Sequence, residues 1–195
     1  MRLFVAIDID DEIRERVTRF LDDVREFAPE ARWVRPESLH VTLKFIGEKS
    51  EAEADEIKLA LKCTNAAPIA MKFRGHGFFP EARAPRVFWV GIQPDSRLTF
   101  LAQEIDEGLS SLNIPKEAHA FNPHLTLGRA GRGSGSPRWQ KGDGPNRSFQ
   151  RLQEKLTTQS APDFGAMTAR EFFLFQSQLS PGGSKYTKLA RFELR

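Results

Sequence analysis

The stretch Ser38-Leu39-His40-Val41-Thr42-Leu43-Lys44-Phe45 alternates polar and apolar residues, as a β-strand with one buried face does. A period of two residues places His40 and Thr42 on one face of such a strand. The opposite face then carries the four apolar side chains Leu39, Val41, Leu43 and Phe45. The stretch therefore predicts a half-buried strand that holds an imidazole and a hydroxyl about 7 Å apart.

A second copy of this pattern occurs at Asn122-Pro123-His124-Leu125-Thr126-Leu127-Gly128-Arg129, 84 positions further along the chain from His40 to His124. Both copies contain His, any residue, Thr and Leu, and period two again puts the His and the Thr on one face. Two imidazoles, each accompanied by a hydroxyl, can grip one small anion from opposite sides. The pair of motifs predicts a single site built from two distant parts of the chain.

Length and composition indicate an ordinary globular protein. The 195 residues suit one domain, 1–195, or two closely packed lobes, and 39% hydrophobic with 28% charged residues leaves no apolar run of the roughly 20 residues that span a bilayer. Cys63 is the single cysteine, which excludes an intrachain disulfide and a cysteine-based zinc site. The apolar start of the chain meets Asp8 and Asp10, so it predicts a first strand rather than a signal peptide. We expect a cytoplasmic monomer.

Periodicity and turn residues predict two similar blocks of strand, helix and strand. Strands are expected at 2–8, 32–35, 39–46, 69–73, 87–92, 119–128, 167–178 and 186–194. Helices are expected at 11–27, 51–63 and 96–112, with a fourth short helix after 147. This order predicts a bilobal, duplicated α+β fold in which two mainly antiparallel sheets face each other across a central cleft, with helices outside.

A basic loop lies between the second motif and the fourth helix. Residues 131–147 are rich in Gly, Pro, Ser and Arg and are expected to form a flexible loop. From residue 129 to residue 151, six basic residues oppose Asp143 alone, an excess of five that suits a polyanion or a solvated surface.

The residue types of the two motifs suit phosphoryl chemistry without a metal. Imidazole gives and takes protons near neutrality because its ordinary pKa is about 6.5. One neutral histidine can accept a proton from water while a protonated one donates to a leaving oxygen. Threonine hydroxyls can bind the non-bridging oxygens of a phosphate. No cofactor is implied, and the other histidines, His76 and His119, show no metal-ligand spacing.

The sequence resembles the RNA 2',3'-cyclic phosphodiesterases, formerly called 2'-5' RNA ligases, of the two-histidine phosphoesterase superfamily. The resemblance rests on residues 40–47, on residues 121–129 and on the tail Phe175-Gln176-Ser177-Gln178-Leu179-Ser180-Pro181-Gly182-Gly183-Ser184-Lys185-Tyr186, and it runs from the first strand to the last. It implies metal-independent opening of a terminal 2',3'-cyclic phosphate to a 2'-phosphate. The implied partner is RNA with such an end, with tRNA fragments or small cyclic nucleotides as variants. Its bases could stack on Phe78, Phe79, Trp139 or Tyr186, of which the first three are the better candidates, although most aromatic residues here are more simply explained by the core.

The resemblance also implies roles for individual residues. His40 would protonate the departing 3'-oxygen and His124 would activate water, although two nearly symmetric motifs do not by themselves distinguish acid from base. Thr42 and Thr126 would hold the phosphate, and Arg129 would neutralise its charge. Strict alternation puts Arg129 on the face opposite to Thr126, so the strand must end or twist at Gly128 for the guanidinium to reach the cleft.

Two other functions use the same residues. Reversible 2'-5' joining of RNA would differ only in its product, and a non-catalytic module would bind an RNA end or a nucleotide without turnover. Lys44 is in phase with His40 and Thr42, but a solvent-exposed place at the rim suits it equally, so it is left outside the predicted site.

Overall fold

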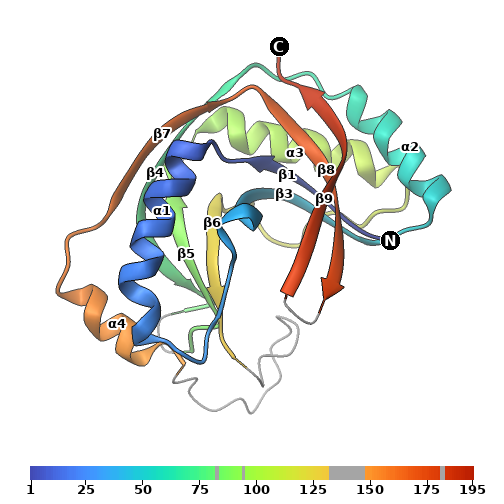
Figure 1. The fold of residues 1–195 in the computed structure, drawn as a ribbon. Coiled ribbons are helices and arrows are strands. Elements are labelled where there is room, and N and C mark those ends of the chain that lie inside the picture. The colour runs from blue at the N-terminus through green and yellow to red at the C-terminus, as the bar shows by residue number, and fades with distance from the viewer. Residues whose placement is uncertain (82–83, 94, 132–147, 181–182) are drawn as a thin grey trace.

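The computed structural model describes residues 1–81, 84–93, 95–131, 148–180 and 183–195 (Figure 1). Its strands are β1 (Arg2–Asp8), β2 (Arg32–Trp33), β3 (His40–Glu48), β4 (Ile69–Phe79), β5 (Val87–Ile92), β6 (His124–Arg129), β7 (Asp163–Ala169), β8 (Glu171–Ser180) and β9 (Gly183–Glu193). Its helices are α1 (Asp11–Val24), α2 (Glu51–Lys62), α3 (Ser96–Ser110) and α4 (Gln150–Thr157), with short 3-10 turns η1 (Arg25–Phe27) and η2 (Pro36–Ser38).

The strands form one open antiparallel sheet in the order β7-β4-β5-β6-β3-β1-β8-β9, with β2 paired to β6. Its two halves, β7-β4-β5-β6 and β3-β1-β8-β9, meet where Val41 of β3 lies opposite Leu125 of β6. The expected α+β fold with antiparallel strands and outer helices is confirmed. The two expected sheets are the two halves of this sheet, and they are joined at the centre of the two motifs.

The two halves repeat one arrangement, in which β1-α1-β3 corresponds to β5-α3-β6. Each long helix packs against the half to which its own strands do not belong, because α1 contacts β7 and α3 contacts β3. Phe20 of α1, for example, lies with its ring centroid 5.3 Å from that of Phe164 on β7. In Figure 1, α1 accordingly lies over the half that contains β4 and β5. This exchange of helices holds the halves together around their short central contact.

Each motif strand contains a β-bulge at the same place. In β3, Thr42 lies opposite Ala6 whereas Lys44 lies opposite Val5, so Leu43 is an extra residue. In β6, Thr126 lies opposite Trp89 whereas Gly128 lies opposite Phe88, which makes Leu127 the extra residue. An extra residue shifts the alternation by one, so everything after it changes face. The bulges therefore move the side chains that follow each threonine to the opposite face of the strand from the one that strict alternation predicts.

The strand boundaries differ from the expected ones in two informative places. Residues 167–178 were expected to form one strand, but β7 ends at Ala169 and β8 begins at Glu171 because the chain passes from one half to the other there. The second motif strand begins at His124 rather than 119, directly after Pro123, which has no N–H to donate to a ladder. Residues 119–123 are therefore irregular, and 119–122 line a cavity described below.

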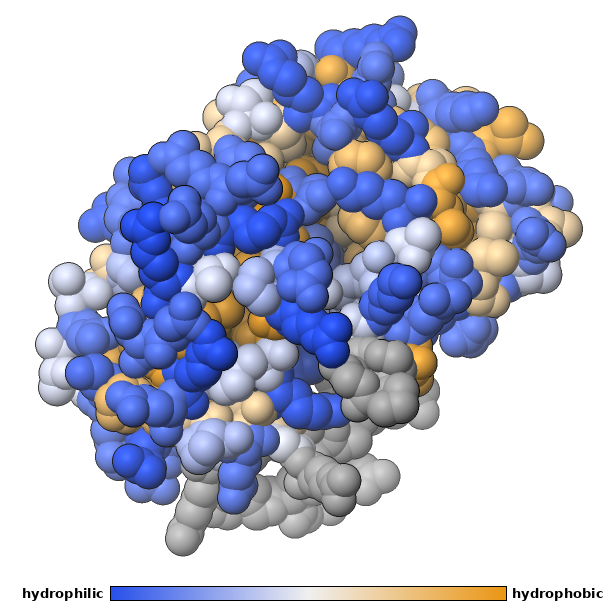
Figure 2. Space-filling model, in the orientation of Figure 1, coloured by the Kyte–Doolittle hydropathy of each residue, from blue (hydrophilic) through white to orange (hydrophobic). Residues whose placement is uncertain are grey.

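The surface seen in the orientation of Figure 1 is mainly hydrophilic, and apolar side chains are visible chiefly between and beneath the polar ones (Figure 2). The apolar side chains of α1, namely Ile13, Val17, Leu21 and Val24, are buried, and Asp10 caps this helix by accepting a hydrogen bond of 2.9 Å from the Ile13 amide. Among the described helices, none combines the length and the apolar character needed to cross a membrane.

Lys44 is buried, with only 2% of its surface exposed. The bulge at Leu43 turns it away from His40, and its ammonium donates to the carboxylate of Asp106 on α3 at 2.5 Å and to the Pro115 carbonyl at 2.6 Å. A carboxylate oxygen of Glu117 lies 3.6 Å from the same nitrogen. Lys44 thus ties the first motif strand to α3 and to the chain that leads into the second motif.

Replacing Asp106 by alanine is expected to lower the free energy of unfolding by about 3 kcal/mol, because it leaves the buried ammonium without its nearest counter-charge. Lys44→Met should cost less, about 1 kcal/mol, since methionine removes the charge and fills similar space. Urea unfolding followed by circular dichroism measures both changes. A larger loss in Lys44→Met than in Asp106→Ala would contradict a net cost of burying the charge.

Candidate active site

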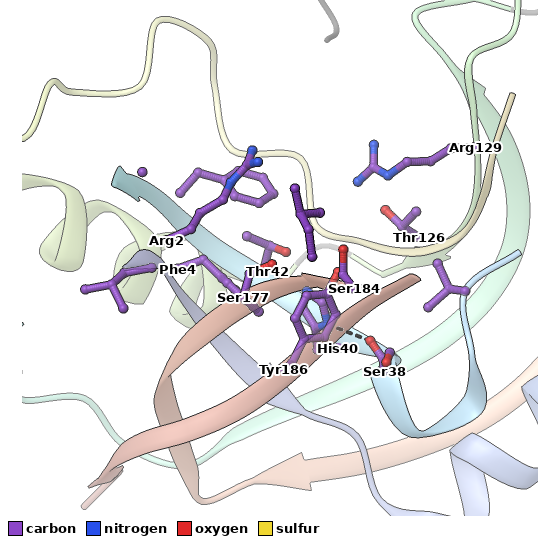
Figure 3. A pocket seen from close by; sticks show the side chains of 15 residues that line it. Arg2, Phe4, Ser38, His40, Thr42, Thr126, Arg129, Ser177, Ser184 and Tyr186 are labelled. Atoms are coloured by element: carbon purple, nitrogen blue, oxygen red, sulfur yellow. Dashed lines mark hydrogen bonds between the residues drawn. The ribbon is translucent and has the colours of Figure 1, made fainter. Parts of the chain in front are cut away.

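Two cavities meet at the junction of the two halves. The first has a volume of about 390 Å³ and is lined by His40, Thr42, Thr126 and Arg129, together with Arg2, Phe4, Phe45, Ser177, Ser184 and Tyr186 among others (Figure 3). The second, of about 800 Å³, is lined by His124, Phe79, Asn122 and residues of α3. Both are lined by Thr42 and Phe45. The two predicted histidines therefore lie in the walls of two adjoining cavities.

The register between β3 and β6 explains this arrangement. Because Val41 lies opposite Leu125 in an antiparallel pair, one step along the strands brings His40 towards Thr126, and one step the other way brings Thr42 towards His124. Each histidine is thus paired with the threonine of the other motif. The register therefore brings the four side chains of the two motifs together across the central pair of strands, and Thr42 lines both cavities.

His40 lies in an aromatic environment. Its ring centroid is 4.8 Å from that of Phe4 and 5.1 Å from that of Tyr186, and the Phe175 ring follows at 6.1 Å. Burial among these rings lowers the pKa of His40 to about 4, although the Ser38 carbonyl and the carboxylate of Asp8 act in the opposite direction. His40 is therefore neutral at pH 7 when the cavity holds no anion.

His124 also lies beside aromatic rings. Its ring lies 4.9 Å from that of Phe79, edge to face, and 6.4 Å from that of Trp89. Burial lowers its pKa, and the positive charge of Arg129 acts in the same direction. His124 is accordingly disfavoured as an imidazolium until a negative charge reaches the site.

Both imidazoles are held in the same way. Nδ1 of His40 lies 2.7 Å from the Ser38 carbonyl oxygen, and Nδ1 of His124 lies 2.8 Å from that of Asn122. A carbonyl oxygen can only accept, so each Nδ1 carries the hydrogen and donates it. Nε2 of each neutral ring then keeps a lone pair, which suits it to accept a proton. This backbone contact, two residues before each histidine, sets the tautomer in both motifs.

Arg129 reaches the first cavity because of the bulge at Leu127. After the extra residue, Gly128 faces the core and Arg129 returns to the face of Thr126. A side chain at Gly128 would have no room, since its Cβ would lie 2.9 Å from the ring of Trp33. The sequence required the strand to end or twist at Gly128 for Arg129 to reach the cleft, and the bulge at the preceding residue meets this requirement.

The guanidinium of Arg129 is available for an anion. Burial and the nearby charges of Arg32 and Arg2 lower its pKa. Within the described part of the chain, no carboxylate pairs with this guanidinium. An arginine held in this way is a strong binding group for phosphate.

The predicted RNA contacts have different outcomes. Tyr186 lines the first cavity and Phe79 the second. Phe78 lines neither, because it lies opposite Phe88 in the ladder and shares its inward face, with ring centroids 5.0 Å apart. Trp139 and residues 132–147 of the predicted basic loop lie outside the described residues.

Phe45 and Arg2 are among the residues of the first cavity that sequence reasoning did not select. Phe45 follows the bulge at Leu43 and is 60% exposed, although period two placed it on the buried face. Its position corresponds to that of Arg129 in the other motif, 84 residues later. Arg2 also lines this cavity. Aligning the two motifs places Phe45 at the position of Arg129. This alignment would have indicated that Phe45 faces the cavity, once the bulge in one motif was known.

Acidification is expected to destabilise the protein through His40. In the unfolded chain this histidine takes up a proton below about pH 6.5, whereas the folded protein resists it until about pH 4. The free energy of unfolding therefore falls as the pH is lowered through this window, by about 2 kcal/mol when partial access to solvent is allowed for.

The comparison of His40→Asn with the unchanged protein measures this effect. Urea unfolding at pH 7 and at pH 4.5 should show a loss of stability about 2 kcal/mol smaller in the variant, because asparagine does not titrate. Carboxylates contribute equally to both proteins. Equal losses in the two proteins would contradict a buried, neutral His40.

Comparison with known proteins gives consistent relationships. The chain matches the family described as LigT like Phosphoesterase twice, over residues 7–89 and 90–186. It is 36% identical to an RNA 2',3'-cyclic phosphodiesterase of Archaeoglobus fulgidus, over 99% of this chain and 100% of that protein. A protein of the same name from Methanothermobacter thermautotrophicus is 30% identical, over 100% and 99% of the two chains.

Solved structures show the same fold. TT0787 of Thermus thermophilus superimposes with a TM-score of 0.77 at 30% identity, over 100% of this chain and 98% of the other. LigT of E. coli complexed with 3'-AMP gives a TM-score of 0.76 at 27% identity, over 99% and 97%.

The fold and these relationships define a phosphoesterase, an enzyme of the hydrolase class. The chain belongs to the LigT-like phosphoesterase family.

Proposed function

We propose that this enzyme hydrolyses the 2',3'-cyclic phosphate at the end of an RNA to a 2'-phosphate, without a metal ion. The observation that carries the proposal is the register of β3 with β6, which brings the two histidines and two threonines of the motifs together at the junction of the two halves, with Arg129 in the wall of the first cavity. The name shared by the relatives from Archaeoglobus fulgidus and Methanothermobacter thermautotrophicus supports the choice of substrate.

The reaction needs one proton acceptor and one proton donor. Water attacks phosphorus while Nε2 of His124 takes its proton, and the new P–O bond forms as the bond to the 3'-oxygen breaks. The imidazolium of His40 gives its proton to that 3'-oxygen, and phosphorus stays attached to the 2'-oxygen. Thr42, Thr126 and Arg129 bind the non-bridging oxygens and stabilise the charge that develops there.

The low pKa of His40 fits this scheme if the substrate brings a negative charge into the site, because His40 can then be protonated. A phosphate anion in a desolvated cavity favours the imidazolium beside it and raises its pKa. We infer that the enzyme takes up one proton together with the substrate. His124 is neutral before the substrate enters and is ready to act as the base.

The test is incubation of the purified protein with an oligoribonucleotide that ends in a 2',3'-cyclic phosphate, in the presence of a chelator. The expected product carries a 2'-phosphate, identified by its resistance to a phosphatase specific for 3'-phosphates and by its mass, which is one water higher. Within the described residues, no three His, Cys, Asp or Glu side chains gather as a metal site. An unchanged cyclic end with folded protein would refute the proposal, and loss of activity in chelator would refute metal independence.

The same assay separates the other functions that the motifs allow. Addition of an RNA with a free 5'-hydroxyl would reveal 2'-5' joining as a longer product. Binding of the end without turnover would indicate a non-catalytic module. A cytoplasmic location and a monomeric state stay predictions.

A further inference from the structure

Arg2 occupies the far side of the first cavity. It is the first residue of β1 and shares the face of Phe4, whose ring contacts His40. Two residues along a strand span about 7 Å, so the Arg2 backbone lies one such step beyond the aromatic wall of His40. Across the ladder it lies opposite Ser177 of β8, which lines the same cavity. Arg2 is therefore part of the cavity but distant from the reacting centre.

Arg2 has no counter-charge among the described residues. Glu48 lies opposite it on β3, but the Glu48 carboxylate is 3.6 Å from the amino group of Met1 and forms no ion pair with Arg2. Tyr186 and Ser177 present only hydroxyl groups to this part of the cavity. The guanidinium is thus free to bind an anion that enters from solvent.

Arg2 and Arg129 stand on opposite sides of one cavity. Figure 3 shows both guanidinium groups directed into it, with Thr42 and His40 between them. Their charges influence each other, since Arg2 is among the groups that lower the pKa of Arg129. A single phosphate bound at the motif threonines balances the positive charge of Arg129 but not that of Arg2. The cavity of about 390 Å³ has room for more than one phosphate, since a water molecule takes about 30 Å³.

We propose that Arg2 binds the phosphodiester that joins the last two nucleotides of the substrate. This inference rests on the proposed function and makes it more specific. The preferred substrate is an RNA end of at least two nucleotides, and a 2',3'-cyclic mononucleotide is a poorer substrate because it lacks the charge that Arg2 recognises.

Phe45 supplies the surface between the two anion sites. Its ring is exposed, lines both cavities and lies 6.4 Å from that of Phe4. It takes the position that Arg129 has in the other motif, so the two halves offer an apolar ring on one side and a cation on the other. A ribose or base between two phosphates can pack on such a ring without any sequence preference.

Three substrates test the role of the charge. They are a 2',3'-cyclic mononucleotide, a dinucleotide with the same cyclic end, and that dinucleotide with an uncharged methylphosphonate linkage. We expect kcat/KM to be about tenfold higher for the charged dinucleotide than for the mononucleotide, and the methylphosphonate to lose most of this gain.

Arg2→Gln should lower kcat/KM about tenfold for the charged dinucleotide and less than about twofold for the other two substrates. Arg19→Gln is the matched control, because Arg19 lies on the outer face of α1 and is 71% exposed in an ion pair with Glu15. It should change none of the three values. An equal effect of Arg2→Gln on all three substrates, or no difference between charged and uncharged linkages, would overturn the inference.

Binding separates this inference from the proposed function. The affinities of the mononucleotide and dinucleotide 2'-phosphates can be measured by calorimetry whether or not turnover occurs. Arg2→Gln should weaken binding of the dinucleotide about tenfold and leave the mononucleotide unchanged. If this binding pattern is found without turnover, only the proposed hydrolysis is refuted. If the dinucleotide binds equally well to Arg2→Gln and to the unchanged protein, the role of Arg2 is refuted.

Discussion

Replacing His124 by asparagine is expected to lower kcat for an RNA 2',3'-cyclic phosphate by about 10³-fold, and His40→Asn should have an effect of similar size. Acid and base catalysis by a positioned side chain contributes a factor of about 10² to 10⁴. The asparagine side chain is of comparable size and can still form a hydrogen bond, but it cannot give or take a proton near neutral pH. Product formation under conditions of saturating substrate measures the change.

His76→Asn is the matched control for both variants. His76 lies on β4, with its ring 6.0 Å from that of Phe88, and lines neither of the two cavities described. It should retain at least half of the activity. Near-ultraviolet circular dichroism of all three variants checks the fold. A kcat above one tenth of the original value in folded His40→Asn or His124→Asn would contradict the two-histidine scheme.

Arg129→Gln is expected to lower kcat/KM by about 10²-fold, as loss of a preorganised donor to a developing negative charge does in other enzymes. Glutamine removes the positive charge and the paired N–H donors of the guanidinium but keeps a polar side chain. Arg129→Lys should recover only part of the loss, because an ammonium cannot form two parallel hydrogen bonds to a phosphate.

The substrates of different length distinguish Arg129 from Arg2. Arg129→Gln should affect the mononucleotide and the dinucleotide equally, since both carry the reacting phosphate. An effect of Arg129→Gln on the dinucleotide alone would mean that this residue binds the linkage and not the reacting group. Unchanged kcat/KM for both would remove Arg129 from the site.

The sequence pattern was sufficient to predict, up to the two threonines, which side chains of each motif share a strand face. Alternation put His40 with Thr42 and His124 with Thr126, and the structure brings these four together because the strands meet between the members of each pair. Beyond the threonines the same rule failed. It placed Lys44 beside His40 and Phe45 in the core, whereas Lys44 is buried against Asp106 and Phe45 lines both cavities.

The physical reason is that a bulge belongs to a pair of strands and not to one segment. Leu43 is extra only in relation to β1, and Leu127 only in relation to β5, so neither shift is visible in the residues of the motif alone. The packing of α1 on β7 and of α3 on β3 is likewise decided by contacts between distant segments. Phe78 lay beyond the strand expected at 69–73, whereas β4 continues to Phe79 and places Phe78 opposite Phe88 on the neighbouring strand.

The contact between Val41 and Leu125 has a mechanical consequence. If one half of the sheet rotated slightly against the other about an axis near this pair, each atom would move in proportion to its distance from that axis. The two imidazoles lie next to it and keep their separation. Arg2, at the far end of β1, lies further from this contact than the two imidazoles do, so such a rotation would change the distance between Arg2 and Arg129 more than the distance between the two histidines.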